Sequence, residues 1–164
     1  MDRLELVQTI ISKNPAIRFN DLMRISNLKN GTLTHYITKL ENMKEINVER
    51  TPRITRFYDK SIPDKEARIC KYLTRPTVKE IIMLLLRDGT LTFPQIKEDV
   101  QKSAATVSVC LNDLFKSNII EKTYDIPSNK YSLKHPNFVS AVLHAYFPSY
   151  NTKLVENSAE LMDF

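Results

Sequence analysis

The sequence predicts a mostly α-helical protein with small β-hairpins, built as two copies of one fold. The first observation is an internal match: residues 4–46 align without gaps with residues 78–120, and their apolar positions coincide. The second is a change in the spacing of apolar residues within each copy, from the helical period to the alternation of extended strands. A chain of 164 residues is long enough to hold two such small domains.

Three short helices are predicted in the first copy. Residues 4–11 carry apolar side chains at helical spacing, and Pro15 follows the end of this stretch. A second helix is predicted from about residue 20 to residue 25. A polar turn at residues 26–30 then leads into a third helix, which we place at residues 29–42. Two helices joined by a short turn predict a helix-turn-helix.

A β-hairpin is predicted after the third helix of each copy. Residues 46–50 and 54–58 alternate as strands do, and Pro52 lies in the turn between them. The second copy ends similarly, with strands at residues 120–124 and 130–132. A helix-turn-helix followed by such a hairpin, or wing, is a winged helix-turn-helix. The sequence therefore predicts two winged helix-turn-helix domains in tandem.

Four segments follow from this pattern. We expect a first winged-helix domain at residues 1–62, a connecting helix at 63–75, a second winged-helix domain at 76–135 and a C-terminal helical tail at 136–164. The tail helix is expected to break at Pro148 and to resume from about Asn151.

The first helix of the second copy is apolar on nearly all sides. Ile82, Met83 and Leu86 stand where the first copy has polar residues. Such a helix needs cover, because a large exposed apolar stripe promotes aggregation. We expect the C-terminal tail and a second copy of the chain to supply the cover, and so predict a homodimer formed through the C-terminal helices.

Composition excludes several functional classes. The chain has only two glycines, so neither a P-loop nor a dinucleotide-binding loop is expected. Its histidines and carboxylates form no spaced ligand or catalytic cluster, and Cys70 and Cys110 have no ligand-spaced neighbours. The longest apolar run, residues 81–86, is too short to cross a membrane. We expect a cytoplasmic protein that is not an enzyme and has neither a cofactor nor a metal site.

Basic residues are concentrated in the first copy. The net charge of the chain is +5, and residues 1–62 hold 11 basic and 7 acidic side chains, a balance of +4. Subtracting the apolar face of the third helix leaves short polar and basic side chains facing outward, as a helix in a DNA major groove requires. A solvated helix face is the alternative interpretation. These residues are Lys29, Asn30, Thr32, Thr34, His35, Thr38 and Lys39.

The wing of the first copy, residues 47–58, is also basic. Arg50, Arg53 and Arg56 lie on it, with no acidic residue between Glu49 and Asp59. Arginine at a wing tip can bind phosphate or enter the minor groove. Charge that only protects an edge strand from aggregation is the alternative.

The second copy is less basic. Val109 and Asp113 replace His35 and Lys39 of the first copy. Dimerisation or ligand sensing is therefore the alternative to DNA contact for this copy. Its candidate DNA-binding residues are Ser103, Thr106, Ser108, Asn112 and Lys130.

At these positions the sequence resembles archaeal tandem winged helix-turn-helix transcriptional regulators. The resemblance rests on residues 28–36, on the basic wing 48–58 and on residues 105–108. It implies binding of promoter DNA, commonly as a dimer.

The expected function is sequence-specific binding of double-stranded DNA in transcription regulation, using the recognition helix 29–42 and the wing 47–58. The alternative is a tandem winged-helix scaffold that binds proteins in a chromosome or transcription complex. Charge discriminates the two, because a scaffold needs no basic wing and should expose an apolar surface.

Overall fold

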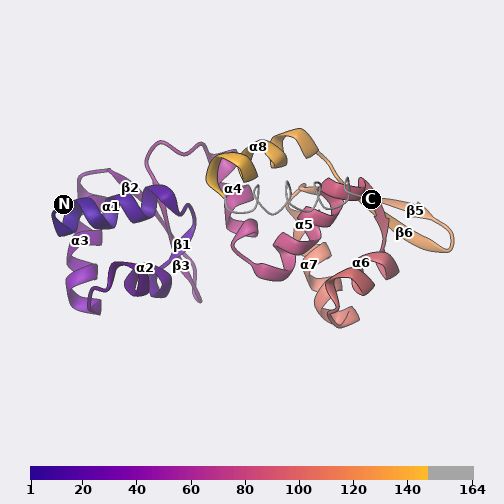
Figure 1. Cartoon of the computed structure of the whole chain (residues 1–164), viewed down its shortest axis with the longest axis horizontal. Helices are drawn as coiled ribbons and strands as arrows, with labels where there is room; N and C mark the ends of the chain where they lie inside the picture. Colours follow the sequence, from indigo (N-terminus) through magenta and orange to yellow (C-terminus); the bar gives the residue numbers. More distant parts are fainter. Residues whose placement is uncertain (148–164) are drawn as a thin grey trace, which may run out of the picture. The chain divides into compact units, whose positions relative to one another are not determined.

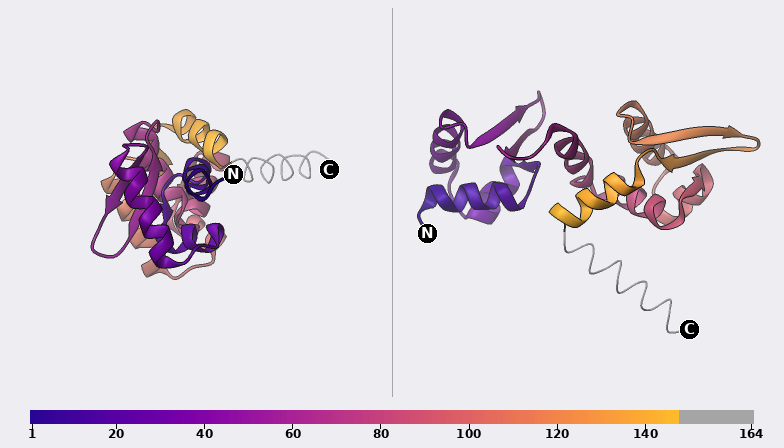
Figure 2. Two further views of the ribbon diagram at one scale, coloured as in Figure 1. Left: turned by 90° about the vertical axis from the view of Figure 1, so that its left-hand side faces the viewer. Right: turned by 90° about the horizontal axis from the view of Figure 1, so that it is seen from above.

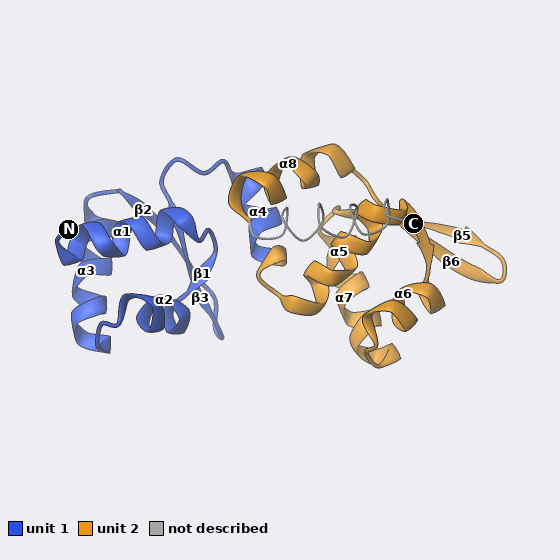
Figure 3. Ribbon diagram, in the orientation of Figure 1, with its two compact units in different colours: residues 1–71 blue, residues 72–164 orange. Residues whose placement is uncertain are grey.

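The computed structural model describes residues 1–147. They form two compact units, Met1–Lys71 and a second one that begins at Tyr72 (Figure 3). The boundary lies within helix α4 (Asp64–Leu73), inside the segment 63–75 that we expect to connect the domains. The end of the expected C-terminal tail, residues 148–164, lies outside the described residues.

Ahead of α4, the first unit has three helices and a three-stranded antiparallel sheet with the strand order β1-β3-β2 (Figure 1). Asp2 begins the first helix by accepting a hydrogen bond from the Glu5 amide at 2.8 Å, and Asn27 ends the second in a left-handed conformation. Before α4, the elements are α1 (Arg3–Lys13), β1 (Ile17–Arg18), α2 (Phe19–Ser26), α3 (Asn30–Asn42), β2 (Ile46–Arg50) and β3 (Thr55–Asp59).

The core of the first unit lies between its three helices and the sheet. Leu33 and Leu40 of α3 and Phe57 of β3 are almost completely buried in it, and Phe19 contacts Phe57 with ring centroids 6.5 Å apart. Burial of these side chains is the main stabilising contribution, about 1.5–3 kcal/mol for each large apolar group.

The second unit has the same order of elements followed by an additional helix. Its strand order is β4-β6-β5, and its β5–β6 hairpin extends beyond helices α5–α7 (Figures 1 and 2). Thr92 and Gln95 form a capping box at the start of α6. The elements are α5 (Pro76–Asp88), β4 (Thr90–Thr92), α6 (Phe93–Val100), α7 (Ala104–Lys116), β5 (Ile120–Asp125), β6 (Ser128–Leu133) and α8 (Pro136–Tyr146).

Corresponding elements of the two units are separated by the offset found in the sequence. Helix α2 begins at Phe19 and α6 at Phe93, a difference of 93 − 19 = 74 positions. Strand pairing repeats too, since Ile17 pairs with Phe57 and Leu91 pairs with Tyr131. Equivalent apolar positions thus lead to equivalent local structure.

The prediction of a mostly helical chain with small β-hairpins is confirmed. Element boundaries differ slightly: α2 is one residue longer at each end than predicted, and β6 starts at Ser128 instead of at residue 130. Ile82, expected to need cover, is completely buried, whereas Met83 and Leu86 are half-buried. No helix in residues 1–147 is long and apolar enough to span a membrane.

We predict that both cysteines react very slowly with a thiol reagent in the folded protein. Cys70 and Cys110 are buried, and burial raises the pKa of the Cys70 thiol to about 12 and also raises the pKa of Cys110. Few thiolates therefore exist at pH 8. Ellman's reagent should label two thiols per chain in guanidinium chloride and almost none without it; rapid native labelling would contradict the burial.

Candidate nucleic-acid interface

The outward face of α3 presents the polar side chains that the sequence singles out. Its core side is fixed by Leu33, Ile37 and Leu40, all buried, so the opposite side of the helix faces solvent. Thr32 is half-buried at the edge of this face. The exposed members are Lys29, Asn30, Thr34, His35, Thr38 and Lys39.

Hydrogen bonds within α3 orient these side chains. The Thr34 hydroxyl donates to Oδ1 of Asn30 at 3.3 Å, and the Thr38 hydroxyl donates to the Thr34 carbonyl at 2.9 Å. His35 lies edge-on to the ring of Tyr36, with centroids 5.3 Å apart. Each threonine oxygen keeps its acceptor capacity, and Asn30 keeps its amide donors. The face can therefore both donate and accept hydrogen bonds from a partner.

A compact turn places Arg53 at the tip of the β2–β3 hairpin. Thr51 closes this turn: its amide and its hydroxyl both donate to the Ile54 carbonyl, at 3.0 and 2.7 Å, and its Oγ1 accepts from the Ile54 amide at 3.1 Å. Arg53 is exposed and has no acidic partner within residues 1–147. Its guanidinium is free to bind an anion.

Arg50 instead joins the wing to α3. Its two terminal nitrogens donate to the two carboxylate oxygens of Glu41 at 2.9 and 2.7 Å, a fork that fixes relative orientation. The hydrogen bonds from Arg50 lower the pKa of the Glu41 carboxyl, so Glu41 stays ionised near neutral pH. Arg50 is thus engaged in an exposed ion pair that links the wing to the last turn of α3, and its contact with DNA stays a prediction.

From the sequence we expect Arg56 to contact DNA, but the structure buries its side chain. Only 5% of its surface is exposed, and its Nη1 donates to the carbonyl of Ala16 at 2.9 Å. Ala16 has a left-handed backbone, with φ of +68°, next to β1. Arg56 therefore holds the junction of α1 and β1 inside the unit and is not part of the outward surface. Three arginines in a short hairpin suggested one basic cluster, but the side chain of the third is buried.

The free cations of the first unit include three that flank the face of α3. Lys29 immediately precedes α3, Lys39 belongs to it and Arg53 is on the wing, and none has an ion pair in the described part of the chain. By contrast, Arg18 and Arg24 of the same unit both pair with one aspartate, Asp21. Unpaired cations thus lie on both sides of the outward face of α3, and others of this unit, such as Arg3 and Lys13, lie on α1.

Most of the candidate DNA-binding residues of the second unit form hydrogen bonds or ion pairs with neighbouring side chains. Ser103 caps α7, accepting from the Thr106 amide at 3.2 Å and donating to the Thr106 hydroxyl at 2.9 Å. Lys130 pairs with Asp125 at 2.8 Å. Ser108 and Asn112 are exposed on the outward face of α7. Two of the five candidates are therefore left without such local partners.

The outward surface of the second unit is also more apolar. Tyr124 and Ile126 of the β5–β6 hairpin are 80% and 97% exposed, and Val109 on α7 is 58% exposed. Phe115, on the last turn of α7, stands at the position equivalent to Glu41 in the first unit. The fork between Arg50 and Glu41 has no counterpart here. Within the described residues, no cluster of three metal-ligating side chains exists in either unit.

A family model matches part of the second unit. Residues 75–122, from the start of α5 into β5, match the model described as bacterial regulatory protein, arsR family. The match and the helix–helix–hairpin geometry together show that the second unit has the winged helix-turn-helix fold. A comparison with curated proteins found no match.

Several solved structures are similar to this chain. Reduced HlyU from Vibrio cholerae is 15% identical, with 51% of this chain and 90% of HlyU covered and a TM-score of 0.43. PcaV from Streptomyces coelicolor, a transcriptional regulator in complex with its natural ligand, is 13% identical, with 84% and 89% covered and a TM-score of 0.41. Streptococcus pneumoniae FabT in complex with DNA is 16% identical, with 82% and 90% covered and a TM-score of 0.38.

The substitution Arg56→Ala should destabilise the protein. Removing the buried guanidinium leaves the Ala16 carbonyl without this donor, which costs about 1–3 kcal/mol in the free energy of unfolding. Urea denaturation followed by circular dichroism measures this. Arg53→Ala is the matched control, because an exposed arginine should change stability by less than about 0.5 kcal/mol. Equal stabilities of the two variants would show that Arg56 does not hold this junction.

Proposed function

We propose that this protein is a transcriptional regulator, not an enzyme, that binds double-stranded DNA sequence-specifically through its first unit. The proposal includes two winged helix-turn-helix domains in tandem, of the kind found in the archaeal regulators that the sequence resembles. One observation carries it: a helix face of threonine, asparagine and histidine is flanked by three cations that have no ion pair within the described residues. They are Lys29, Lys39 and Arg53.

Two classes of contact are proposed for this surface. Short polar side chains on α3, such as Thr34 and His35, are suited to hydrogen bonds with base edges in the major groove. Lysines at both ends of this face and Arg53 on the wing are suited to the phosphates on either side. The fork from Arg50 to Glu41 keeps the wing at a constant angle to α3, so both classes of contact can form together.

We further propose that the chain acts as a homodimer through its C-terminal helices. Helix α8 buries Val139, Val142 and Leu143 but leaves Phe138 37% exposed. An aromatic side chain on the outside of this helix supports association there. In a symmetric dimer the two first units would bind two half-sites of a palindromic operator.

A protein-binding scaffold is the second candidate function. It is favoured by the exposed apolar side chains of the second unit, Val109, Tyr124 and Ile126, because protein interfaces are enriched in such residues. The free cations of the first unit have no role in it. Binding to a duplex that is independent of salt, or absent, would favour the scaffold over the regulator.

The substitution Arg53→Ala should reduce the salt dependence of DNA binding. Each phosphate contact releases about one counterion, so the slope of log K against log salt concentration should fall by about one unit. Fluorescence anisotropy with a labelled duplex at several salt concentrations measures this slope. Arg24→Ala is a control on the same unit, since Arg24 already pairs with Asp21. An unchanged slope in Arg53→Ala would count against the phosphate contact.

Substitutions on α3 should alter sequence preference instead. If Thr34 or His35 binds a base edge, changing either to alanine should weaken binding to the preferred operator by about 1–3 kcal/mol and leave binding to random duplexes almost unchanged. Selection of bound sequences from a random pool first supplies the operator. Competition assays then compare the two kinds of duplex, and equal losses on both would refute base recognition.

A further inference from the structure

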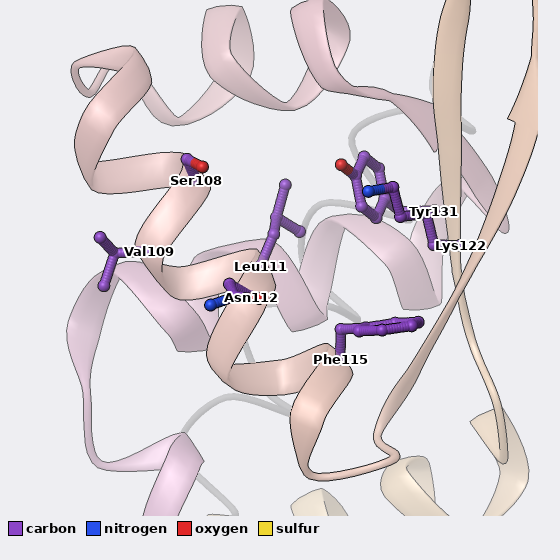
Figure 4. A pocket seen from close by; sticks show the side chains of 7 residues that line it. All are labelled: Ser108, Val109, Leu111, Asn112, Phe115, Lys122 and Tyr131. Atoms are coloured by element: carbon purple, nitrogen blue, oxygen red, sulfur yellow. The ribbon is translucent and has the colours of Figure 1, made fainter.

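An open hollow lies between α7 and the β5–β6 hairpin of the second unit (Figure 4). It has a volume of about 210 Å³. Ser108 and Asn112 of α7 line it together with Lys122 and Tyr131 of the hairpin. Leu111 and Phe115 provide an apolar part of its wall. Polar and apolar groups therefore converge on one small space.

Tyr131 brings an unsatisfied polar group to this hollow. Its side chain belongs to a residue that is only 8% exposed, and its hydroxyl has no hydrogen-bond partner in residues 1–147. The ring of Tyr131 is buried, but its hydroxyl oxygen is accessible from the hollow. In Figure 4 this hydroxyl points from the hairpin toward α7. It is positioned to donate to a group that enters the hollow.

Lys122 brings a cation to the same place. It is the direct cross-strand partner of Tyr131, so both side chains lie on the same face of the sheet. Its Nζ lies 5.1 Å from the ring centroid of Tyr124, and it has no acidic partner among the described residues. An ammonium and a phenol hydroxyl on paired positions of the hairpin are suited to bind an anion.

The first unit shows that folding requires neither group. The positions equivalent to Lys122 and Tyr131 are Val48 and Phe57, which pair across β2 and β3 in the same register. Both are apolar, and both pack in the core of the first unit. The second unit thus has a lysine and a tyrosine where the first has a half-buried valine and a buried phenylalanine. Polar groups that the fold does not require are candidates for binding a ligand.

We propose that this hollow binds a small amphipathic carboxylate. Lys122 would pair with the carboxylate while the Tyr131 hydroxyl donates to it, and Ser108 and Asn112 can add hydrogen bonds from α7. The apolar part of the ligand would pack on Phe115 and Leu111. The volume of about 210 Å³ is below the roughly 300 Å³ at which drug-sized pockets begin, so it suits a phenyl-substituted short-chain acid rather than a larger effector.

Titration of the full chain with 3-phenylpropionate at pH 7, followed by calorimetry without DNA, tests the proposal. We expect saturable binding with one site per chain. Acetate lacks the apolar part, 3-phenylpropan-1-ol lacks the charge and inorganic phosphate lacks both the apolar part and the planar carboxylate. Each should bind at least tenfold more weakly. Absence of saturable binding, or equal binding of the alcohol, overturns the proposal, and tighter binding of phosphate overturns it in favour of a nucleic-acid backbone contact.

Two variants locate the site. Lys122→Gln and Tyr131→Phe should each weaken 3-phenylpropionate binding at least tenfold, about 1.4 kcal/mol. Tyr131→Phe keeps the buried ring and copies the residue of the first unit, and a thermal melt confirms that it is folded. Lys134→Gln is the matched control, because this exposed lysine does not line the hollow. Unchanged affinity in folded Lys122→Gln overturns the assignment. DNA binding does not enter this test, so its failure leaves the proposed function of the first unit intact.

Discussion

Burial of one side of α3 is the constraint on which the proposed interface depends. Leu33, Ile37 and Leu40 are packed in the core of the first unit, so the rotation of the helix about its axis is fixed. A rotation that exposed these three side chains would cost several kcal/mol of apolar burial. The polar side of α3 therefore faces solvent. The core thus orients the polar surface of α3.

The wing is held by a different kind of interaction. The fork between Arg50 and Glu41 is exposed and contributes little to global stability, as surface ion pairs generally do. Its value is geometric, because two parallel hydrogen bonds define an orientation between the hairpin and the last turn of α3. In the second unit Tyr124 and Phe115 occupy these two positions. The two units share one backbone pattern but have diverged in the chemistry of this surface.

Local patterns made most of the fold predictable, and long-range side-chain contacts explain what was missed. Apolar spacing located the helices and hairpins, since helix and strand periods depend on neighbouring residues. Arg56 looked like one more basic residue of the wing, but its carbonyl partner, Ala16, is 40 positions away. Neither the fork formed by Glu41 nor the hollow at Tyr131 leaves a local signal. Alignment of the two copies could have found the latter, because Tyr131 falls on the apolar Phe57.

The central claim is that one face of the first unit, formed by α3 and the tip of the wing, binds the duplex. Nuclear magnetic resonance of the full chain during titration with duplex DNA tests it most directly. We expect the amide shifts of residues 29–39 and 51–54 to change, whereas those on the exposed side of α1 should stay constant. Shift changes confined to the second unit, or to the exposed side of α1, would contradict it.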